Sequence, residues 1–342
     1  MRRLLWIFPT AVALVFVLVL LVAGRGDVPY ITRVLVHRDS SITDVDWKSS
    51  VTVPAVSPRP WAGASGCPAL PTTNAQSIVL VKDGRLVCSW GSADRPAAAF
   101  SISKTLVSLL ASRSLPLDTS LGTVDPRFTG ITVGDLLDMR SGIAFSPNTP
   151  YPWVNTDQAA VYYASDLAST VLRRATVTSP PGVFTYNDYA PNLVGLTYQR
   201  LSGGLLTDGP LRSLWAELGA QDPVSWCVDS AGFPYHESGL VVSARDLARV
   251  GQRVLDGGAW ASRSLSGSPT VETFGGLDAV GYRNGWWVLP RPDGSGDLAA
   301  MGDHGQIMVV SPRTRTVAVR MGDDDGANIT IARQLQAVAN AL

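Results

Sequence analysis

A serine and a lysine three residues apart could together form an activated nucleophile in this chain. The sequence Ser-Ile-Ser-Lys at 101–104 precedes an apolar run at 105–110. Residues three apart lie on one face of a helix, so the Lys104 amine can lie against the Ser101 hydroxyl. A desolvated amine loses its proton more readily and can then take one from the serine, whereas an arginine stays protonated.

Lysine is rare in this chain, which makes its presence at 104 informative. Of the 28 basic residues only three are lysines, namely Lys48, Lys82 and Lys104. The alternative interpretation of the 101–104 pattern is a surface serine beside a solvated lysine on an ordinary helix. The rest of the chain must decide between the two.

Composition permits a large core and argues against nucleic acid as a partner. The 342 residues are 46% hydrophobic and 16% charged, with a formal net charge of zero and no basic stripe. None of the three cysteines lies in a C-x-x-C pattern or near a histidine, so no metal site is expected. Cys67 and Cys88 flank a short hairpin region and could form a disulfide; the alternative is three buried thiols.

The N-terminus predicts export. Residues Leu4 to Ala23 carry no charge and follow Arg2 and Arg3, a pattern typical of a transmembrane helix whose remaining chain lies outside the cytoplasm. The alternative is a cleaved signal peptide ending near Gly24. We therefore expect a membrane anchor or signal segment at 1–26, a Pro-rich linker or arm at 27–72 and one catalytic domain at 73–342.

Strand patterns occur at both ends of that domain, and helix patterns lie between them. A hairpin with an Asp-Gly turn is expected at 76–90, and later strands at 285–289, 306–310 and 316–320. Helices are expected at 101–112, 131–139, 159–174, 192–201, 242–255 and 329–342. This order predicts an α+β fold whose antiparallel sheet is built from both chain ends, so the hairpin must join the C-terminal strands.

Five segments in the same order resemble the serine β-lactamase and penicillin-recognising superfamily over residues 75 to 342. The resemblance is strongest to its class C-like branch, which includes esterases, D-alanyl-D-alanine peptidases and 6-aminohexanoate-dimer hydrolases. The segments are 101–104 (S-x-x-K), 131–142 (I-T-x-x-x-L-L-x-x-x-S-G), 181–188 (P-G-x-F-x-Y-N-D), 244–251 (A-R-D-L-A-R-x-G) and 302–306 (G-x-H-G-Q). The resemblance implies a β-lactamase/transpeptidase-like fold, with Ser101 as nucleophile and Lys104 as its activating partner.

Tyr186 and Asp188 lie in the third segment, after a Pro-Pro-Gly break. A phenol close to a lysine ammonium can act as a general acid or base, which is the role the resemblance implies for Tyr186; the alternative is a core tyrosine. The family usually has asparagine at the position of Asp188. A carboxylate cannot donate a hydrogen bond as an amide does, so Asp188 could instead hold Lys104 in its charged form.

His304 stands where other family members have K-T-G or H-x-G. It could donate to an oxyanion or a substrate carboxylate or relay a proton, or it could be a surface turn residue. The oxyanion hole is expected to use the main-chain N–H of Ser101 and that of a residue on the C-terminal strand edge, in the range 306–308, with Gly305 and Gln306 as the candidate site residues there. Trp287 could line the acyl pocket, although one of the two adjacent tryptophans is expected in the core.

These expectations describe an exported serine hydrolase that cleaves an ester or amide through an acyl-serine intermediate, without metal or organic cofactor. A neutral His304 would clamp a carboxylate poorly, which favours an amidase or esterase over a β-lactamase. The alternatives are a D,D-peptidase or penicillin-binding protein, and a catalytically silent sensor of envelope fragments. The expected partners are a small or peptide-like substrate and the membrane, and no nucleic acid; the sequence does not indicate the oligomeric state.

Overall fold

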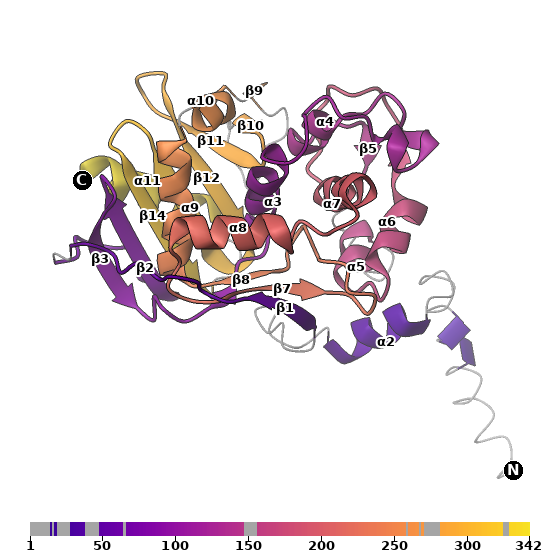
Figure 1. Ribbon diagram of the computed structural model, residues 1–342, viewed down its shortest axis with the longest axis horizontal. Helices are drawn as coiled ribbons and strands as arrows, with labels where there is room; N and C mark the ends of the chain where they lie inside the picture. Colours follow the sequence, from indigo (N-terminus) through magenta and orange to yellow (C-terminus); the bar gives the residue numbers. More distant parts are fainter. Residues whose placement is uncertain are drawn as a thin grey trace, which may run out of the picture.

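Strands from both ends of the chain form one eight-stranded antiparallel sheet (Figure 1). The computed structural model describes residues 14–15, 17–18, 28–37, 48–63, 66–146, 156–257, 259–266, 268–269, 281–323 and 328–342. The sheet order is β3-β2-β14-β13-β12-β11-β10-β9. Its strands are β2 (Ala75–Lys82), β3 (Arg85–Gly91), β9 (Ser268–Pro269), β10 (Gly281–Arg283), β11 (Trp286–Pro290), β12 (Gly296–Gly302), β13 (Gln306–Ser311) and β14 (Thr316–Gly322).

The predicted joining of the N-terminal hairpin to the C-terminal strands is confirmed. β2 pairs with β14 so that Val79 lies opposite Val319. Within the hairpin, Asp83 and Gly84 both have positive φ values, 48° and 71°. Two consecutive left-handed residues give the tight turn that matches the twist of paired strands, and Asp-Gly is a preferred sequence for it.

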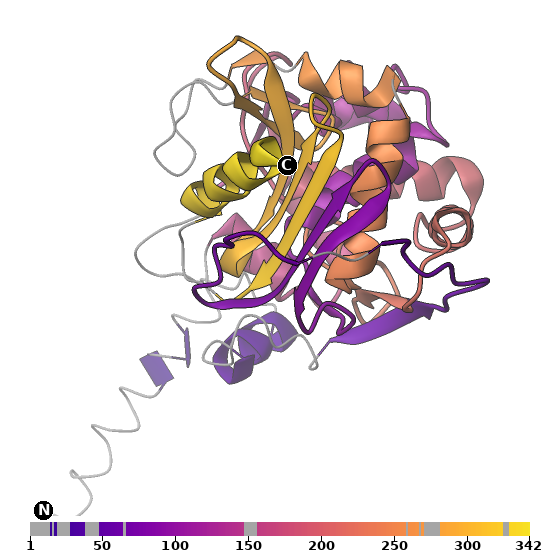
Figure 2. The same ribbon diagram turned by 90° about the vertical axis from the view of Figure 1, so that its left-hand side faces the viewer.

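Helices cover both faces of this sheet (Figure 2). α9 (Ala244–Asp256) packs on β2, β13 and β14, and α11 (Asn328–Ala341) packs on β12 to β14 from the other side. A Cβ atom at Gly251 of α9 would lie 2.5 Å from Val317 Cγ1, so the absence of a side chain lets this helix approach the sheet closely. Ser243 caps α9 by accepting from the Asp246 N–H, as the sequence predicts.

The helical insertion follows β4 (Ala97–Ala98) and contains α3 (Ile102–Ser112), α4 (Val133–Leu137), α5 (Asp157–Tyr162), α6 (Leu167–Arg174), α7 (Tyr189–Ser202) and α8 (Gly209–Leu218); α10 (Ala259–Leu265) comes later. The prediction of one helix over 159–174 is wrong. The chain breaks between α5 and α6, where the Ala164 carbonyl accepts from the Tyr235 hydroxyl at 2.6 Å and Asp166 caps a new helix.

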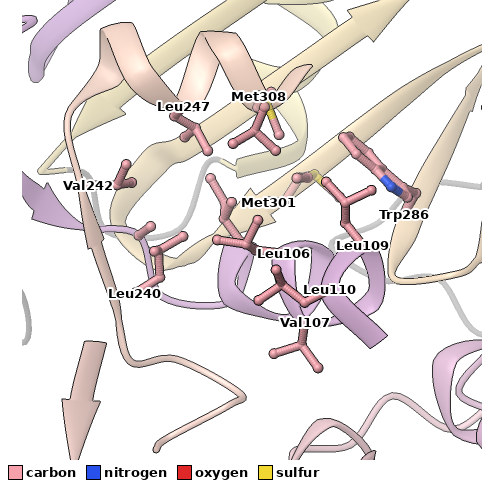
Figure 3. Packing of buried hydrophobic residues seen from close by; sticks show 14 of the residues in the cluster. Leu106, Val107, Leu109, Leu110, Leu240, Val242, Leu247, Trp286, Met301 and Met308 are labelled. Atoms are coloured by element: carbon pink, nitrogen blue, oxygen red, sulfur yellow. The ribbon is translucent and has the colours of Figure 1, made fainter. Parts of the chain in front are cut away.

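α3 lies at the centre of the molecule, which explains its apolar sequence. Its residues Leu106, Val107, Leu109 and Leu110 are all buried. They pack among hydrophobic side chains of β8 (Leu240–Val242), α9, β11, β12 and β13 (Figure 3). Burial of leucine-sized side chains contributes about 1.5–3 kcal/mol each, so the first turn of α3 is held on a rigid base.

The N-terminal arm is more regular than its proline content predicts. It contains α2 (Val28–His37) and β1 (Ser49–Val53), and β1 pairs with β7 (Val224–Val228) in a second sheet of order β1-β7-β8-β4. A third, two-stranded sheet joins β5 (Ile143–Ala144) and β6 (Thr176–Val177). The prolines do not prevent these elements, because Pro29 lies in the first turn of α2, where a missing N–H is tolerated, and Pro54 and the later prolines of the arm come after β1.

No helix of the described ranges is both long and apolar enough to cross a lipid bilayer. Most of the predicted anchor, Leu4 to Ala23, lies outside those ranges.

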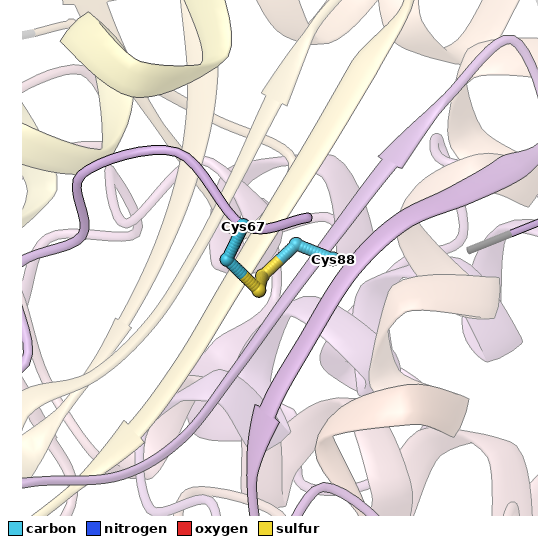
Figure 4. Close-up of a disulfide and its surroundings, with 2 residues drawn as sticks. All are labelled: Cys67 and Cys88. Atoms are coloured by element: carbon cyan, nitrogen blue, oxygen red, sulfur yellow. A yellow bond between two sulfur atoms is a disulfide. The ribbon is translucent and has the colours of Figure 1, made fainter. Parts of the chain in front are cut away.

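A disulfide joins the arm to the first hairpin. Cys67 of the arm is bonded to Cys88 of β3, so the pairing that the sequence allows is present (Figure 4). Cys227 is buried on β7. The disulfide closes a loop with a sequence separation of 21 residues, which restricts the unfolded chain.

We expect Cys67→Ser to lower the free energy of unfolding by about 3 kcal/mol, the loss typical of a loop of this size. Denaturant titration followed by tryptophan fluorescence measures the change. A reducing agent should shift the wild-type midpoint and leave the midpoint of the Cys67→Ser/Cys88→Ser protein in place. Equal sensitivity of both proteins to reduction would contradict a stabilising disulfide.

Candidate active site

Ser101 stands at the N-terminal cap of α3, but its hydroxyl does not cap the helix. The Ser101 side chain makes no capping hydrogen bond. Instead, Lys104 Nζ lies 2.7 Å from Ser101 Oγ, as the i, i+3 spacing predicts. The hydroxyl therefore contacts the lysine, at a position where a serine side chain commonly accepts a hydrogen bond from a main-chain N–H of the helix.

Lys104 is buried among three oxygen-bearing neighbours. Its side chain is 3% exposed; Nζ lies 2.8 Å from Asp188 Oδ1 and donates to the Glu237 main-chain oxygen at 3.1 Å. Burial alone would lower the pKa of Lys104, but the charge of Asp188, that of Tyr186 and the Asp188 hydrogen bond together raise it above the ordinary lysine value. Lys104 is therefore an ammonium group at neutral pH.

Tyr186 is the third member of the cluster. Lys104 Nζ lies 4.9 Å from the centroid of its ring. Burial raises the pKa of the phenol, while the charge of Lys104 and hydrogen bonds with Ser101 and Lys104 oppose that rise. The phenol is therefore protonated at neutral pH and can donate its proton to a leaving group.

Two neighbours fix the position of Tyr186. Trp287 of β11 stacks on its ring, with centroids 5.5 Å apart and planes 28° apart. The adjacent Asn187 is buried and ties the loop to α7, since its Nδ2 donates to the Thr185 carbonyl and its Oδ1 accepts from the Ala190 N–H. Trp287 thus supports the phenol ring, and both Trp286 and Trp287 are buried in the core, whereas the sequence analysis expected only one of them there.

Asp188 occupies the position where the family usually has asparagine. It is the residue before α7, yet its side chain makes no capping hydrogen bond. Its carboxylate is instead directed to Lys104 and its side chain is 14% exposed. The structure therefore places it where the sequence analysis suggested, as a partner of the lysine.

Hydrogen bonds from two other elements hold α3 in place. Ser103 Oγ accepts from the Leu240 N–H of β8 at 3.0 Å, and Thr105 Oγ1 donates to the Gly285 carbonyl at 2.6 Å. A Cβ at Gly285 would lie 2.9 Å from the Lys104 carbonyl oxygen. The turn between β10 and β11 therefore approaches the catalytic helix closely only because residue 285 has no side chain.

The backbone beside Ser101 is in an uncommon conformation. Phe100 and His304 have φ values of 46° and 57°, and their ring centroids are 5.6 Å apart. Non-glycine residues in this region cost about 1–3 kcal/mol each and cluster at functional sites. His304 therefore lies half-buried beside the residue that precedes the nucleophile.

The predicted oxyanion donors Gly305 and Gln306 are engaged elsewhere. The Gly305 N–H donates to Asn328 Oδ1 at 2.9 Å, and the Gln306 N–H donates to the Asp303 carbonyl. The Gln306 side chain bonds both main-chain groups of Gly322, so it joins β13 to β14. Neither residue is available as the donor that the sequence analysis expected, because a turn comes before β13.

The N–H groups of Ser101 and Asp303 are better placed as donors. Neither N–H donates to another group in the described part of the chain. Gly302, next to Asp303, packs on the segment before Ser101, since a Cβ there would lie 2.2 Å from the Ala99 carbonyl oxygen. This close approach places the residue before Asp303 beside the segment that leads into α3, whose N-terminal end favours negative charge.

The described residues hold no group of three or more His, Cys, Asp or Glu side chains that could bind a metal ion.

Comparisons with known proteins agree with this geometry. The Beta-lactamase family model matches residues 73–340. A 6-aminohexanoate-dimer hydrolase of Paenarthrobacter ureafaciens is 27% identical over 246 residues, which are 62% of this chain and 62% of that protein. This chain therefore matches less than two thirds of that relative's length.

Solved structures share the fold. A Bacillus anthracis protein provisionally assigned as a 6-aminohexanoate-dimer hydrolase has a TM-score of 0.75 at 18% identity, covering 88% of this chain and 93% of its own. A penicillin-binding protein homologue of Caulobacter crescentus has a TM-score of 0.60 at 14% identity, covering 78% of this chain and 92% of its own. A class C beta-lactamase mutant has a TM-score of 0.55 at 14% identity, covering 77% of this chain and 91% of its own.

We expect Asp188→Asn to lower the rate of Ser101 labelling at neutral pH and to shift the pH at which labelling rises, because an amide cannot take up a proton from Lys104 as the carboxylate can. In the variant the amine must lose its proton to solvent before it can act on Ser101, and the carboxylate no longer raises the pKa of Lys104. The labelling rate with a fluorophosphonate across pH measures the shift. Asp188→Glu keeps the charge and should show a much smaller one; an unchanged profile in Asp188→Asn would show that Asp188 does not control Lys104.

Proposed function

Because this chain belongs to the beta-lactamase family, we propose that it is a serine hydrolase that cleaves an ester or linear amide through an acyl intermediate on Ser101. One observation carries the proposal: Lys104 Nζ lies within 2.8 Å of both Ser101 Oγ and Asp188 Oδ1. A hydroxyl, an amine and a carboxylate in this order form a path along which a proton can leave the nucleophile.

Acylation begins from a protonated Lys104. As Ser101 Oγ attacks the substrate carbonyl, its proton passes to Lys104, which in turn passes one of its protons to Asp188. The tetrahedral oxyanion is stabilised by the N–H groups of Ser101 and Asp303. Loss of one such donor typically costs about 2.7–4 kcal/mol of transition-state stabilisation.

Tyr186 completes the first half of the reaction. Its phenol gives a proton to the leaving alcohol or amine as the bond to the acyl carbon breaks, and the resulting phenolate recovers a proton from Lys104. The proton held by Asp188 then returns to Lys104, so all three groups regain their starting states. Water releases the acyl group by the same steps in reverse order.

The charges of the site favour a substrate that has no carboxylate next to its scissile bond. The ammonium of Lys104 is matched by the carboxylate of Asp188, and the position of the family's K-T-G lysine holds His304. A substrate carboxylate, as in a penicillin, lacks the cationic partner that binds it well in related proteins. The named activity of the Paenarthrobacter relative, hydrolysis of a 6-aminohexanoate dimer, supports a linear amide as the substrate class.

We also propose that the catalytic domain acts outside the cytoplasm. The uncharged run from Leu4 to Ala23 after two arginines supports this location, since positive residues tend to stay on the cytoplasmic side. The disulfide between Cys67 and Cys88 supports it independently, because disulfides persist mainly in oxidising compartments.

We expect a fluorophosphonate probe to label Ser101 of the folded protein, and the label to disappear in Ser101→Ala. Mass spectrometry of the labelled peptide identifies the residue. Absence of labelling in a protein with an intact melting transition would favour a binding protein over an enzyme. Stable labelling by penicillin together with D-Ala-D-Ala peptide cleavage would favour the D,D-peptidase alternative.

We expect Lys104→Arg to lower kcat/KM by about 100- to 10,000-fold, because the guanidinium keeps the positive charge but cannot exchange a proton. Hydrolysis of short-chain esters and linear amides provides the assay. The melting temperature of the variant serves as the control for folding. Turnover near that of the wild type would remove Lys104 from the proton path.

A further inference from the structure

A second, half-buried lysine lies near the catalytic cluster, and it comes from the N-terminal arm. Lys48 directly precedes β1, and its Nζ lies 3.6 Å from the ring centroid of Tyr162 and 3.8 Å from that of Tyr235. An ammonium between two aromatic faces is attracted by both, more strongly when it is shielded from water. We call Lys48, Tyr162 and Tyr235 the lysine cage.

The arm is fixed on both sides of the cage. β1 pairs with β7, with Ser49 opposite Val228, so Lys48 is held where β7 ends. On the other side, Arg33 of α2 donates to the Ala164 carbonyl and to Ser230 Oγ. The cage is therefore built from a docked arm, the end of α5 and the loop after β7.

Five titratable or charged groups face Lys48 from these elements: Tyr162, Tyr235, Glu237, Cys227 and Arg33. Burial lowers the pKa of Lys48 to about 8, the charges of Glu237 and Cys227 act to raise it, and Arg33 lowers it. Lys48 is therefore mostly protonated at neutral pH. In turn, burial and the charge of Asp188 raise the pKa of Glu237, while Lys48 lowers it.

Glu237 connects the cage to the catalytic cluster. Its main-chain oxygen accepts from Lys104 Nζ at 3.1 Å, and its Oε2 accepts from Asn192 Nδ2 at 2.8 Å. The same Asn192 nitrogen donates to the Asp188 carbonyl at 2.8 Å. The His236 N–H donates to Asn192 Oδ1, which fixes the orientation of the amide. The Glu237 carbonyl and Asp188, which both contact Lys104, are thus connected through Glu237 itself and through Asn192 to the Glu237 carboxylate.

We propose that Lys48 is a positioning residue of the active site: its ammonium packs on Tyr235, two residues before Glu237, and its charge acts on the Glu237 carboxylate without forming an ion pair with it, while Glu237 with Asn192 holds the Glu237 carbonyl and Asp188 against Lys104. The arm thereby becomes part of the catalytic apparatus, although it precedes residues 73–340, which match the family model. This role rests on the proposed function, because it concerns the same nucleophile.

The test compares Lys48→Met, which keeps the length of the side chain but not its charge, with Lys48→Arg, which keeps the charge. We expect Lys48→Met to lower the rate of Ser101 labelling at least tenfold at pH 7 and to shift the acid limb of the pH profile upward, because Glu237 then protonates more readily. Lys48→Arg should stay within threefold of the wild type. Lys82→Met is the matched control, since Lys82 is the third lysine and its Nζ donates to the Leu342 carbonyl, so its rate and pH profile should not change.

A stability measurement separates this inference from the proposed function. Ionised Glu237 loses a counter-charge in Lys48→Met, so the melting temperature of the variant relative to wild type should fall as pH rises through the ionisation of Glu237. The difference should widen further above about pH 8, because there the folded wild type gives up the Lys48 proton that the unfolded chain still holds, which stabilises the wild type as pH rises. The melting temperatures can be compared even if the wild type fails to label. A failure to label would refute only the proposed function.

Two results would overturn the inference. The first is a Lys48→Met protein with the labelling rate, pH profile and pH-dependent stability of the Lys82→Met control. The second uses Glu237→Gln as a background that folds without the buried charge: if Lys48→Met lowers the labelling rate there as much as in the wild type, the two residues act independently.

Discussion

The ion pair between Lys104 and Asp188 is the interaction on which the site depends. An isolated ammonium at 3% exposure would be costly, and burial alone drives Lys104 toward its neutral form. The carboxylate 2.8 Å away reverses that balance. The same contact that makes a buried lysine tolerable therefore also sets its proton affinity, and with it the state of Ser101 and Tyr186.

Three segments around this pair hold the five polar groups of the site. α3 brings Ser101 and Lys104 to one face, the loop before α7 brings Tyr186 and Asp188, and the segment before β8 presents the Glu237 carbonyl. The sheet supports them from behind, since β11 carries Trp287 against the phenol and the turn at Gly285 presses on α3.

Local signals made much of this arrangement predictable. The Asp-Gly hairpin, the Ser243 cap of α9 and the 101–104 helix depend on residues within a few positions of one another, and all three are present. The joining of β2 to β14 followed from strand patterns at both ends of the domain. The proximity of Tyr186 and Asp188 to Lys104 required the family resemblance, because no spacing in the sequence indicates it.

The features that were missed depend on contacts between distant segments. β1 is stabilised by β7, about 170 residues later, so the prolines that follow it in the arm were the stronger local signal. The break between α5 and α6 depends on the Tyr235 hydroxyl. The donor at Asp303 depends on a turn that occupies the N–H groups of Gly305 and Gln306, and the lysine cage depends on how the arm docks.

The contact between Gly302 and the Ala99 carbonyl has a consequence for how such a hydrolase can diversify. A methyl group at residue 302 would lie 2.2 Å from that oxygen, so the spacing of the two segments that carry the proposed oxyanion donors is set by backbone against backbone. Mutations that enlarge or shrink the surrounding side chains leave this spacing untouched. Substitutions of the side chains around the site can therefore change which substrates fit, while the backbone spacing at Gly302 stays the same.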